Sequence, residues 1–335
     1  MKPKNSGMSS NALVGILKRQ NIPVMLYGVI IMLVLFGFLT GWRNFSGPNL
    51  LLILRNSSVL LLASIGMTMV ILVSQVDLSI GSVMSLSAAV TAVTLEAGIG
   101  IFPAMALGIL SGVAVGAVNG MLIAVLRFDY WISTFATMGI AGGLALVVAK
   151  GGTVPINSYV FDWIGSGRLL GIYLMVYITV FLVLAVGFLL RRTKFGYNIY
   201  SIGGSEQSAV LSGVDVVKNR MAVYICSGFF SAIAGLVLAS MSNSANPIGG
   251  ANYSFDAMAA VIIGGTGFDG GKGGIYGTVL GAVILRILSN GLGIMGIPST
   301  WQKAIIGMVI VVVLMVDALN DKRRKTRELR RVYFQ

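Results

Sequence analysis

The chain contains long, nearly uninterrupted apolar runs, and these runs restrict it to one class of fold. A helix of about 20 apolar residues matches the hydrocarbon core of a bilayer. Hydrophobic residues make up 56% of the 335 residues and charged residues only 10%, with a mean hydropathy of +0.90, whereas soluble domains carry about 25% charged residues. A transmembrane barrel would show alternating apolar and polar residues instead. The sequence therefore predicts an all-α, polytopic transmembrane helical bundle.

Ten segments of the chain are apolar enough to be predicted as membrane spans. The eighth is short and rich in glycine, so it either crosses the membrane or enters and returns as a broken helix. The ten predicted spans are Pro23–Thr40, Leu50–Val73, Leu78–Ala97, Ile101–Leu126, Trp131–Ala149, Leu169–Leu190, Met221–Met241, Phe255–Phe268, Gly274–Gly296 and Trp301–Leu319.

Basic residues are unevenly divided between the two sides that this count defines. The net charge is +13, and 18 of the 24 Lys and Arg residues fall in segments on the side of the N-terminus. Only Arg43, Lys150 and Arg168 fall in the opposite loops. This asymmetry follows the positive-inside rule, so we expect cytosolic termini and basic residues that face lipid rather than nucleic acid. The eighth segment must then cross, because otherwise Lys272 and the basic C-terminus would lie outside.

The predicted spans divide the chain into three parts. Residues 1–22 form a cytosolic N-terminal segment, residues 23–320 a transmembrane domain and residues 321–335 a basic cytosolic tail. We expect the first span to be retained, because a long apolar run followed by bulky residues does not resemble a signal peptide. The sequence does not decide whether the final Tyr333-Phe334-Gln335 belongs to the natural protein.

One long polar segment, residues 191–220, interrupts the apolar sequence. Within it Ser205 is suited to cap a helix, Glu206 would lie in the first turn, and Gly213 would end the helix in the left-handed conformation. Such a helix has about two turns, far fewer than the roughly 12–15 residues that an isolated helix needs in water. Two interpretations fit the pattern equally well: a solvated turn, or a helix that docks a cytosolic partner.

Residues for catalysis and metal binding are scarce. The chain has no histidine and a single cysteine, Cys226, which removes histidine metal sites and the commonest general base. The glycine-rich run around Lys272 departs from a phosphate loop, because Thr266 stands where the first Gly belongs and Gly273 where the hydroxyl belongs. We therefore expect neither an enzyme nor a bound cofactor or metal.

Acidic residues lie near the ends of predicted spans, as Asp77, Glu96, Asp129 and Asp256 do. A secondary transporter would place carboxylates in mid-span, and a channel would carry a charged ring or a filter motif. The remaining interpretation is a transport path that takes its energy from another subunit.

A few polar residues inside this apolar sequence are candidates for function. Asp77 precedes a helix predicted to begin at Leu78, where it could cap the N–H groups of Ser79 or Ile80, or bind a solute or proton; the cap fits its position better. Uncharged polar residues in spans either join helices, which is the commoner role, or contact a solute. The four candidates for the translocation pathway are Asn119, Thr134, Thr137 and Asn290.

Nine short segments, spread over most of the chain from about residue 60 to residue 310, form a consistent series. They are Ser64–Ile71, Val76–Ser82, Gly116–Gly120, Ser133–Met138, Thr193–Gly196, Ser201–Gly204, Leu211–Val214, Ala259–Gly265 and Gly277–Gly281. In this order they resemble the signature of membrane permeases in bacterial sugar importers of the ribose type, which are ATP-binding-cassette (ABC) uptake systems.

The resemblance implies a multi-pass permease of the bacterial cytoplasmic (inner) membrane that pairs with a second copy or a sister permease. It also implies a cytosolic ATPase that binds the ATP, and an extracytoplasmic solute-binding protein. The segment Gly203–Gly213 would be the coupling helix that the ATPase grips. The residues assigned to this coupling loop are Gly203, Gly204, Ser205, Glu206, Ala209, Ser212 and Gly213.

The chain also departs from the family pattern. Ser74-Gln75-Val76 stands where two glycines often precede the aspartate, Asp129-Tyr130-Trp131 replaces a Pro-Pro-Phe sequence, and Phe135-Ala136 replaces Leu-Gly. These departures leave the solute open: a sugar, or a non-sugar such as a nucleoside or a signalling molecule. A self-powered secondary transporter or channel is the alternative from another class.

Overall fold

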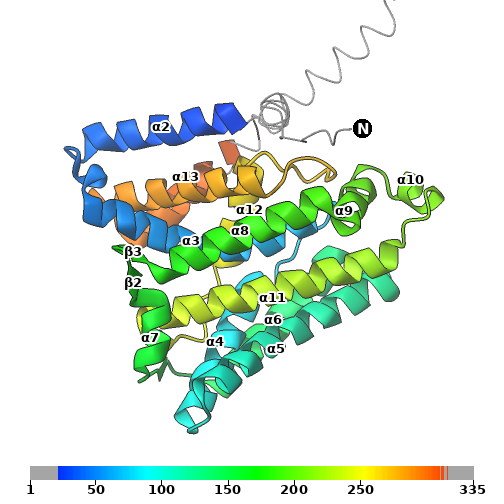
Figure 1. Cartoon of the computed structure of the whole chain (residues 1–335), viewed down its shortest axis with the longest axis horizontal. Helices are drawn as coiled ribbons and strands as arrows, with labels where there is room; N and C mark the ends of the chain where they lie inside the picture. Colours follow the sequence, from blue (N-terminus) through cyan, green and yellow to red (C-terminus); the bar gives the residue numbers. More distant parts are fainter. Residues whose placement is uncertain (1–21, 310, 313–314, 316–335) are drawn as a thin grey trace, which may run out of the picture.

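The structure is a computed structural model that describes residues 22–309, 311, 312 and 315. Apart from Ile22, the predicted N-terminal segment 1–22 lies outside the described residues, as does the tail 321–335. The described part is built from helices with two short two-stranded sheets (Figure 1). The helices are α2 (Ile22–Leu39), η1 (Arg43–Phe45), α3 (Gly47–Leu72), α4 (Ile80–Glu96), α5 (Ile101–Gly120), η2 (Met121–Val125), α6 (Tyr130–Val148), α7 (Tyr159–Ser166), α8 (Leu174–Arg192), α9 (Lys194–Gly204), α10 (Glu206–Leu211), α11 (Val216–Ser242), α12 (Tyr253–Ile263) and α13 (Ile275–Ile294). Residues 299–309 are also helical.

The predicted helical membrane protein is confirmed. Six helices within the described ranges are long and apolar enough to cross a membrane: α3, α5 together with η2, α6, α8, α11 and α13. Each of the ten predicted segments contains a helix, but α12 has only 11 residues. At 1.5 Å per residue it covers about 16 Å, roughly half of a bilayer core.

Three predicted boundaries differ from the structure because turns intervene. The sixth helix, α8, begins at Leu174 rather than at Leu169, since β2 (Arg168–Leu169) and β3 (Ile172–Tyr173) form a hairpin around Leu170 and Gly171, which both have positive φ. Helix α4 begins at Ile80, after an irregular stretch that follows α3. Helix α12 stops at Ile263, where Gly264 and Gly265 follow.

The two longest helices, α3 and α11, pack against each other, and each also packs on helices from the other half of the chain. Helix α3 packs on α12 and α13 from the second half of the chain, whereas α11 packs on α4 and α5 from the first half. Figure 1 shows α11 passing between α8 on one side and α5 on the other. The largest cluster of buried apolar side chains is centred on these two helices. The two halves of the chain therefore share one core.

Glycines allow α5 and α11 to approach closely. Gly108, Gly112, Gly116 and Gly120 recur every fourth residue and lie buried on one face of α5. A Cβ on Gly112 would lie 2.6 Å from the carbonyl oxygen of Gly228, and one on Gly116 would collide with the carbonyl oxygen of Tyr224. In a membrane, where lipid is as apolar as the helix surface, such close contact provides much of the packing energy.

The two ends of the bundle have different character (Figure 1). At one end, β1 (Val154–Pro155) pairs with β4 (Ser244–Ala245), and α7 covers the end of α11. Arg55 of α3 holds this cap, because its Nε donates to the carbonyl oxygen of Gly165 at 3.0 Å and its Nη2 to Ser166 Oγ at 2.9 Å. The opposite end carries α9 and α10.

We predict that Gly116→Ala destabilises the protein by about 1–3 kcal/mol, the usual cost of overpacking a close contact. Gly139 on α6 is the matched control, because a Cβ added there would meet nothing within 4 Å. Gly139→Ala should raise the stability of the protein by up to about 1 kcal/mol, because alanine has a higher helix propensity than glycine. Thermal unfolding in detergent measures both variants. Equal unfolding temperatures for the two would contradict the close-packing account.

Candidate functional site

The polar segment at residues 191–220 contains the predicted helix, α10, and a second helix, α9, that precedes it. Helix α10 occupies Glu206–Leu211, and Ser205 Oγ accepts a hydrogen bond from the N–H of Ser208 at 3.2 Å. Glu206 lies in the first turn, and Gly213, two residues beyond the helix, has a φ of +79°. With six residues, α10 depends on its neighbours for stability.

Sequence reasoning missed α9, which begins only two residues after α8 ends. Thr193 separates the two helices and caps the second, because its Oγ1 accepts the N–H of Gly196 at 3.3 Å. Ile199 and Ile202, three residues apart, are both buried on one face. A Thr cap followed by an apolar pair at helical spacing was the signal that predicts this helix.

The end of α9 is anchored to the core through glycine contacts. A Cβ on Gly203 would collide with the carbonyl oxygen of Leu72 at the end of α3, whereas a Cβ on Gly204 would meet nothing within 4 Å. The same Leu72 carbonyl accepts the N–H of Gly271 at 3.0 Å. Ser74 Oγ donates to Gly203 O, at 3.2 Å, and to Asp269 O, at 2.8 Å. Helix α9, the end of α3 and the loop before α13 thus meet at one point.

Tyr200 adds a further bond between α9 and this loop. Its hydroxyl donates to the carbonyl oxygen of Gly273 at 3.0 Å. Burial raises the pKa of the Tyr200 phenol, against a smaller lowering by Arg191. The phenol therefore stays protonated at neutral pH and keeps its donor, so α9 remains linked to the start of α13.

Helix α10 is held to α11 by charge. Arg220 and Glu206 form a bidentate ion pair, with Nη1 and Oε1 3.1 Å apart. Asp215 caps α11, since its Oδ1 accepts the N–H of Lys218 at 2.9 Å. An exposed ion pair is worth at most about 1 kcal/mol, although bidentate geometry adds directional specificity. These bonds position α10 more than they stabilise it.

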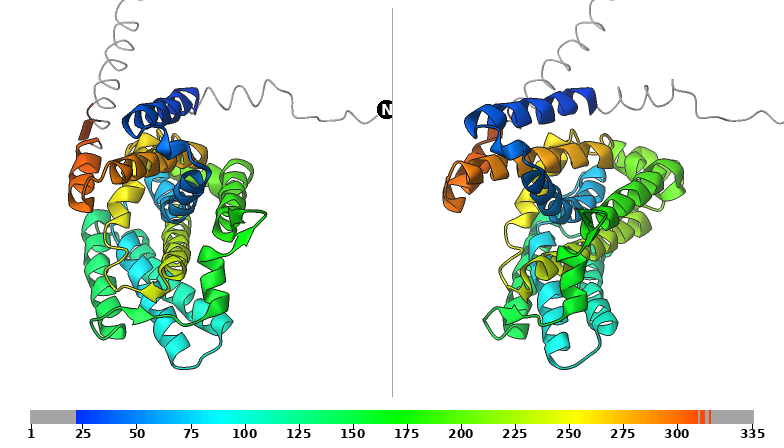
Figure 2. Two further views of the ribbon diagram at one scale, coloured as in Figure 1. Left: turned by 90° about the vertical axis from the view of Figure 1, so that its left-hand side faces the viewer. Right: turned by 60° about the vertical axis from the view of Figure 1, so that its left-hand side comes forward.

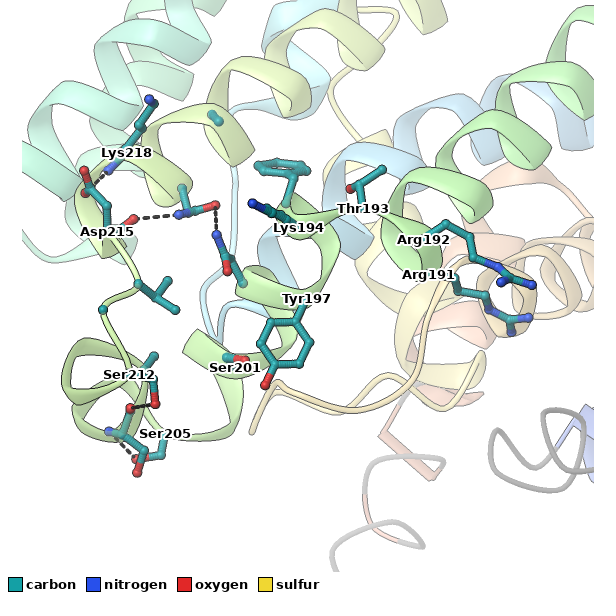
Figure 3. Close-up of a pocket in the computed structure, with 18 residues that line it drawn as sticks. Arg191, Arg192, Thr193, Lys194, Tyr197, Ser201, Ser205, Ser212, Asp215 and Lys218 are labelled. Atoms are coloured by element: carbon teal, nitrogen blue, oxygen red, sulfur yellow. Dashed lines mark hydrogen bonds between the residues drawn. The ribbon is translucent and has the colours of Figure 1, made fainter. Parts of the chain in front are cut away.

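An open groove of about 1230 Å³ runs between the end of α8, α9, α10 and the start of α11 (Figure 3). Its lining is mainly basic and hydroxylic. Ser205, Ser208 and Ser212 line the α10 side, where Ser212 Oγ donates to the Ser208 carbonyl at 2.8 Å. The charged lining residues are Arg191, Arg192, Lys194, Lys218 and Asp215. The surface therefore suits a partner that presents acidic and polar groups.

The apolar residues of α10 divide into an inner and an outer set. Ala209 is 2% exposed and packs within the protein, whereas Leu211 is 88% exposed and Val210 is also exposed. A bulky charge at Ala209 would therefore disturb the internal packing of α10 as well as any partner. Leu211 is the residue that a partner would contact first.

A second polar feature is a buried network around Asp77, which is 1% exposed. Its Oδ1 accepts the N–H and the hydroxyl of Ser79 at 2.9 and 2.6 Å, and its Oδ2 accepts the hydroxyl of Ser227 on α11 at 2.7 Å. Helix α4 begins at Ile80 with Ser79 as its cap residue, so Asp77 closes the turn that leads into the helix. It also ties that turn to α11.

Two of the pathway candidates belong to this network. Asn119 Nδ2 donates to Ser79 Oγ at 2.9 Å, and Thr137 Oγ1 donates to Asn119 Oδ1 at 2.6 Å. Thr134, one turn before Thr137 on α6, is also buried and donates to the carbonyl of Tyr130 at 2.7 Å. The two bonds of Asn119 connect α5 and α6 to the α3–α4 turn, whereas the Thr134 bond stays within α6.

The fourth pathway candidate, Asn290, lies apart from the other three. Its amide pairs with that of Asn49 on α3, with one N–H···O bond of 2.8 Å and one of 2.9 Å. The structure therefore brings Asn119 and Thr137 together and separates Asn290 from them.

We predict that Asp77→Asn unfolds close to the wild-type temperature, because an amide oxygen still accepts from Ser79 and the amide N–H₂ donates to the Ser227 hydroxyl. Asp77→Ala should lose about 1–3 kcal/mol, since it leaves buried hydroxyl groups without a partner. Thermal unfolding of the two variants is the measurement. If Asn destabilises as much as Ala, the carboxylate has a role that these bonds do not describe.

Comparisons with known proteins find one family and many relatives. The family model described as "Branched-chain amino acid transport system / permease component" matches residues 49–314. The ribose import permease protein RbsC of Bacillus subtilis (strain 168) is 39% identical over 271 residues, which cover 80% of this chain and 84% of the relative. The D-allose transport system permease protein AlsC of Escherichia coli (strain K12) is 35% identical, covering 87% and 90%. The L-arabinose transport system permease protein AraH of the same organism is 34% identical, covering 75% and 76%.

Proposed function

The chain belongs to the branched-chain amino acid transport system / permease component family and is a permease subunit of the bacterial inner membrane, and we propose that the solute it transports is a sugar. The observation that carries the proposal is the match to relatives named for ribose, D-allose and L-arabinose over three quarters or more of the chain. The permease is not itself an enzyme. Energy comes from a separate cytosolic ATPase that binds ATP.

The proposed topology has ten crossings with both termini in the cytosol. Helix α12 and the glycine-rich loop after it complete the eighth crossing. The hydrogen bond between Gly271 and Leu72 supports this, because it keeps that loop beside α9 at the α9–α10 end. In this topology residues 1–22 and 321–335 lie in the cytosol, and residues 23–320 form the permease domain.

The α9–α10 surface is the proposed coupling site for the ATPase, with Gly203, Gly204, Ser205, Glu206, Ala209, Ser212 and Gly213 as the coupling loop. Its exposed Leu211, its basic groove and its anchors to α3 and α13 support this assignment. A solute-binding protein docks at the opposite end, near α7. A second copy or a sister permease completes the path between two subunits.

The pathway candidates Asn119, Thr134, Thr137 and Asn290 act in this proposal as helix contacts that set the shape of the path. Their side chains are bonded to protein groups. Asn119, Thr137 and Asn290 therefore hold helices together, Thr134 bonds only within α6, and solute recognition falls to other residues.

The sugar proposal predicts ATP-dependent uptake of at least one of radiolabelled D-ribose, D-allose and L-arabinose. The permease is reconstituted in proteoliposomes with its ATPase and its solute-binding protein, and uptake is measured with and without enclosed ATP. Uptake that proceeds equally without ATP would point to a secondary transporter or channel. ATP-dependent uptake of leucine or of a nucleoside, with none of a sugar, would overturn the solute assignment.

The coupling proposal predicts that Leu211→Arg loses the ATPase on co-purification while it unfolds at the wild-type temperature, because the side chain is 88% exposed. Leu170→Arg is the matched control: Leu170 is 91% exposed and lies in the hairpin at the opposite end. Co-purified ATPase is quantified for both. Equal loss from both variants, or no loss from Leu211→Arg, would contradict this docking site.

A further inference from the structure

A partly open cavity with charged residues in its wall lies between α12, α13 and the helix at residues 299–309. Its volume is about 340 Å³, and its wall carries Asp256 from α12, Arg286 from α13 and Lys303 from the last helix. In both views of Figure 2 that last helix, drawn in orange-red, lies beside α12 and α13. Sequence reasoning counted Asp256 as a span-end residue and gave Arg286 no role, because it could not show that the two side chains meet.

Arg286 lies at membrane depth. It is 11 residues after the first residue of α13 and eight before the last, in a helix long enough to cross a membrane. An arginine at the centre of a transmembrane helix costs about 2.5–3.5 kcal/mol even by the lower estimates, so such residues face a partner or a water-filled cavity and commonly mark a solute path. Both compensating features are present here.

The partners of Arg286 satisfy it only in part. Its Nη2 lies 3.5 Å from Asp256 Oδ2, which is longer than the roughly 2.7–2.9 Å of a strong charge-assisted bond. Its guanidinium carbon lies 5.4 Å from the centre of the Tyr253 ring. Its Nε is buried and has no hydrogen-bond partner among the residues that the structure describes. The guanidinium is therefore only partly bonded, and the 17% of the Arg286 side chain that is exposed adjoins the cavity.

The ion pair also remains accessible from the cavity. The side chain of Asp256 is 27% exposed and that of Arg286 is 17% exposed, in contrast to Asp77, whose two carboxylate oxygens are bonded inside a closed network. A pair that only locked α12 to α13 would gain from a shorter, closed contact. The open geometry leaves carboxylate lone pairs and guanidinium N–H groups that face the same space.

We propose that this cavity is a solute-contact site of the translocation path and that it takes a neutral, hydroxyl-rich solute. The inference rests on the proposed sugar transport and adds the residues that contact the sugar. Asp256 accepts hydrogen bonds from hydroxyl groups, Arg286 donates to hydroxyl or ring oxygens, and the exposed Phe255 offers an apolar face. Asp256 and Arg286 together provide an acceptor and donors side by side, which is what a hydroxyl group needs in order to bond in both directions. The volume lies at the lower end of the roughly 300–1,000 Å³ of small-molecule sites.

The first test fills the cavity without changing its charges. Ser289 lines the cavity from α13 and bonds its own helix at Leu285 O. Ser289→Leu should reduce ATP-dependent uptake of the transported sugar by about tenfold or more. The leucine side chain would keep the sugar away from Asp256 and Arg286, and this is the loss expected when a hydrogen bond to a charged group is broken. The control is Ser111→Leu on α5, a half-buried serine that likewise bonds its own helix, at Gly108 O. Equal uptake by the two variants would overturn the proposal.

The second test distinguishes a solute site from an ion pair that only holds α12 to α13. It is also the decisive test in the event that Ser289→Leu does not fold. Asp256→Asn should lower uptake and change the relative rates for D-ribose, D-allose and L-arabinose. The double exchange Asp256→Arg, Arg286→Asp restores an ion pair, so it should recover the wild-type unfolding temperature but not uptake. Recovery of uptake by the exchange, or an unchanged sugar preference in Asp256→Asn, would overturn the site.

These outcomes are distinct from a failure of the sugar proposal. If the wild-type complex takes up none of the three sugars, the proposed function fails and this inference fails with it. If the wild type transports a sugar and the cavity variants transport it equally well, only the cavity is excluded. The ATPase still co-purifies with every cavity variant, because the cavity and the α9–α10 surface share no residue.

Discussion

Close approach of backbones at glycine is the contact on which the rest of this structure depends. Lipid offers no hydrophobic gain between helices, so packing must come from short contacts. Gly116 brings α5 onto α11 in the core, and Gly203 brings α9 onto the end of α3. The same physical device thus builds the bundle and fixes a short polar helix to it. The contact at Gly203 links α9 directly to the end of α3.

Polar groups inside the bundle fall into two kinds with different consequences. Around Asp77 the oxygens are bonded to Ser79 and Ser227, and the network is closed. Around Arg286 the bonds are long or missing and a cavity adjoins them. A satisfied buried network specifies and rigidifies a fold, whereas an unsatisfied one at membrane depth is suited to a passing solute. The bonding of each group, more than its position in the sequence, separates structure from transport.

The sequence was sufficient for what depends on local pattern. Apolar runs located the helices, and a Ser followed by Glu located α10. It was insufficient where the answer depends on which segments meet. The start of α8 was placed too early because the Leu170–Gly171 turn lies inside an apolar stretch. Asp256 pairs with Arg286, 30 residues further along the chain, because α12 packs on α13. The hydrophobic periodicity of the sequence predicts each helix but not which helices are in contact. Ala209 and Leu211 differ in exposure only because α9 and α11 cover one of them.

The central claim is that the ATPase acts on the transport path through the contact between α9 and α3. Uptake and ATP hydrolysis, measured on the same proteoliposomes for Gly203→Ala and Gly204→Ala, test it most directly. The account predicts that Gly203→Ala, whose Cβ collides with the Leu72 carbonyl, still binds the ATPase and hydrolyses ATP but loses most sugar uptake. Gly204→Ala, whose Cβ meets open space, should retain both activities. Full uptake by Gly203→Ala at a wild-type rate of hydrolysis would contradict the account.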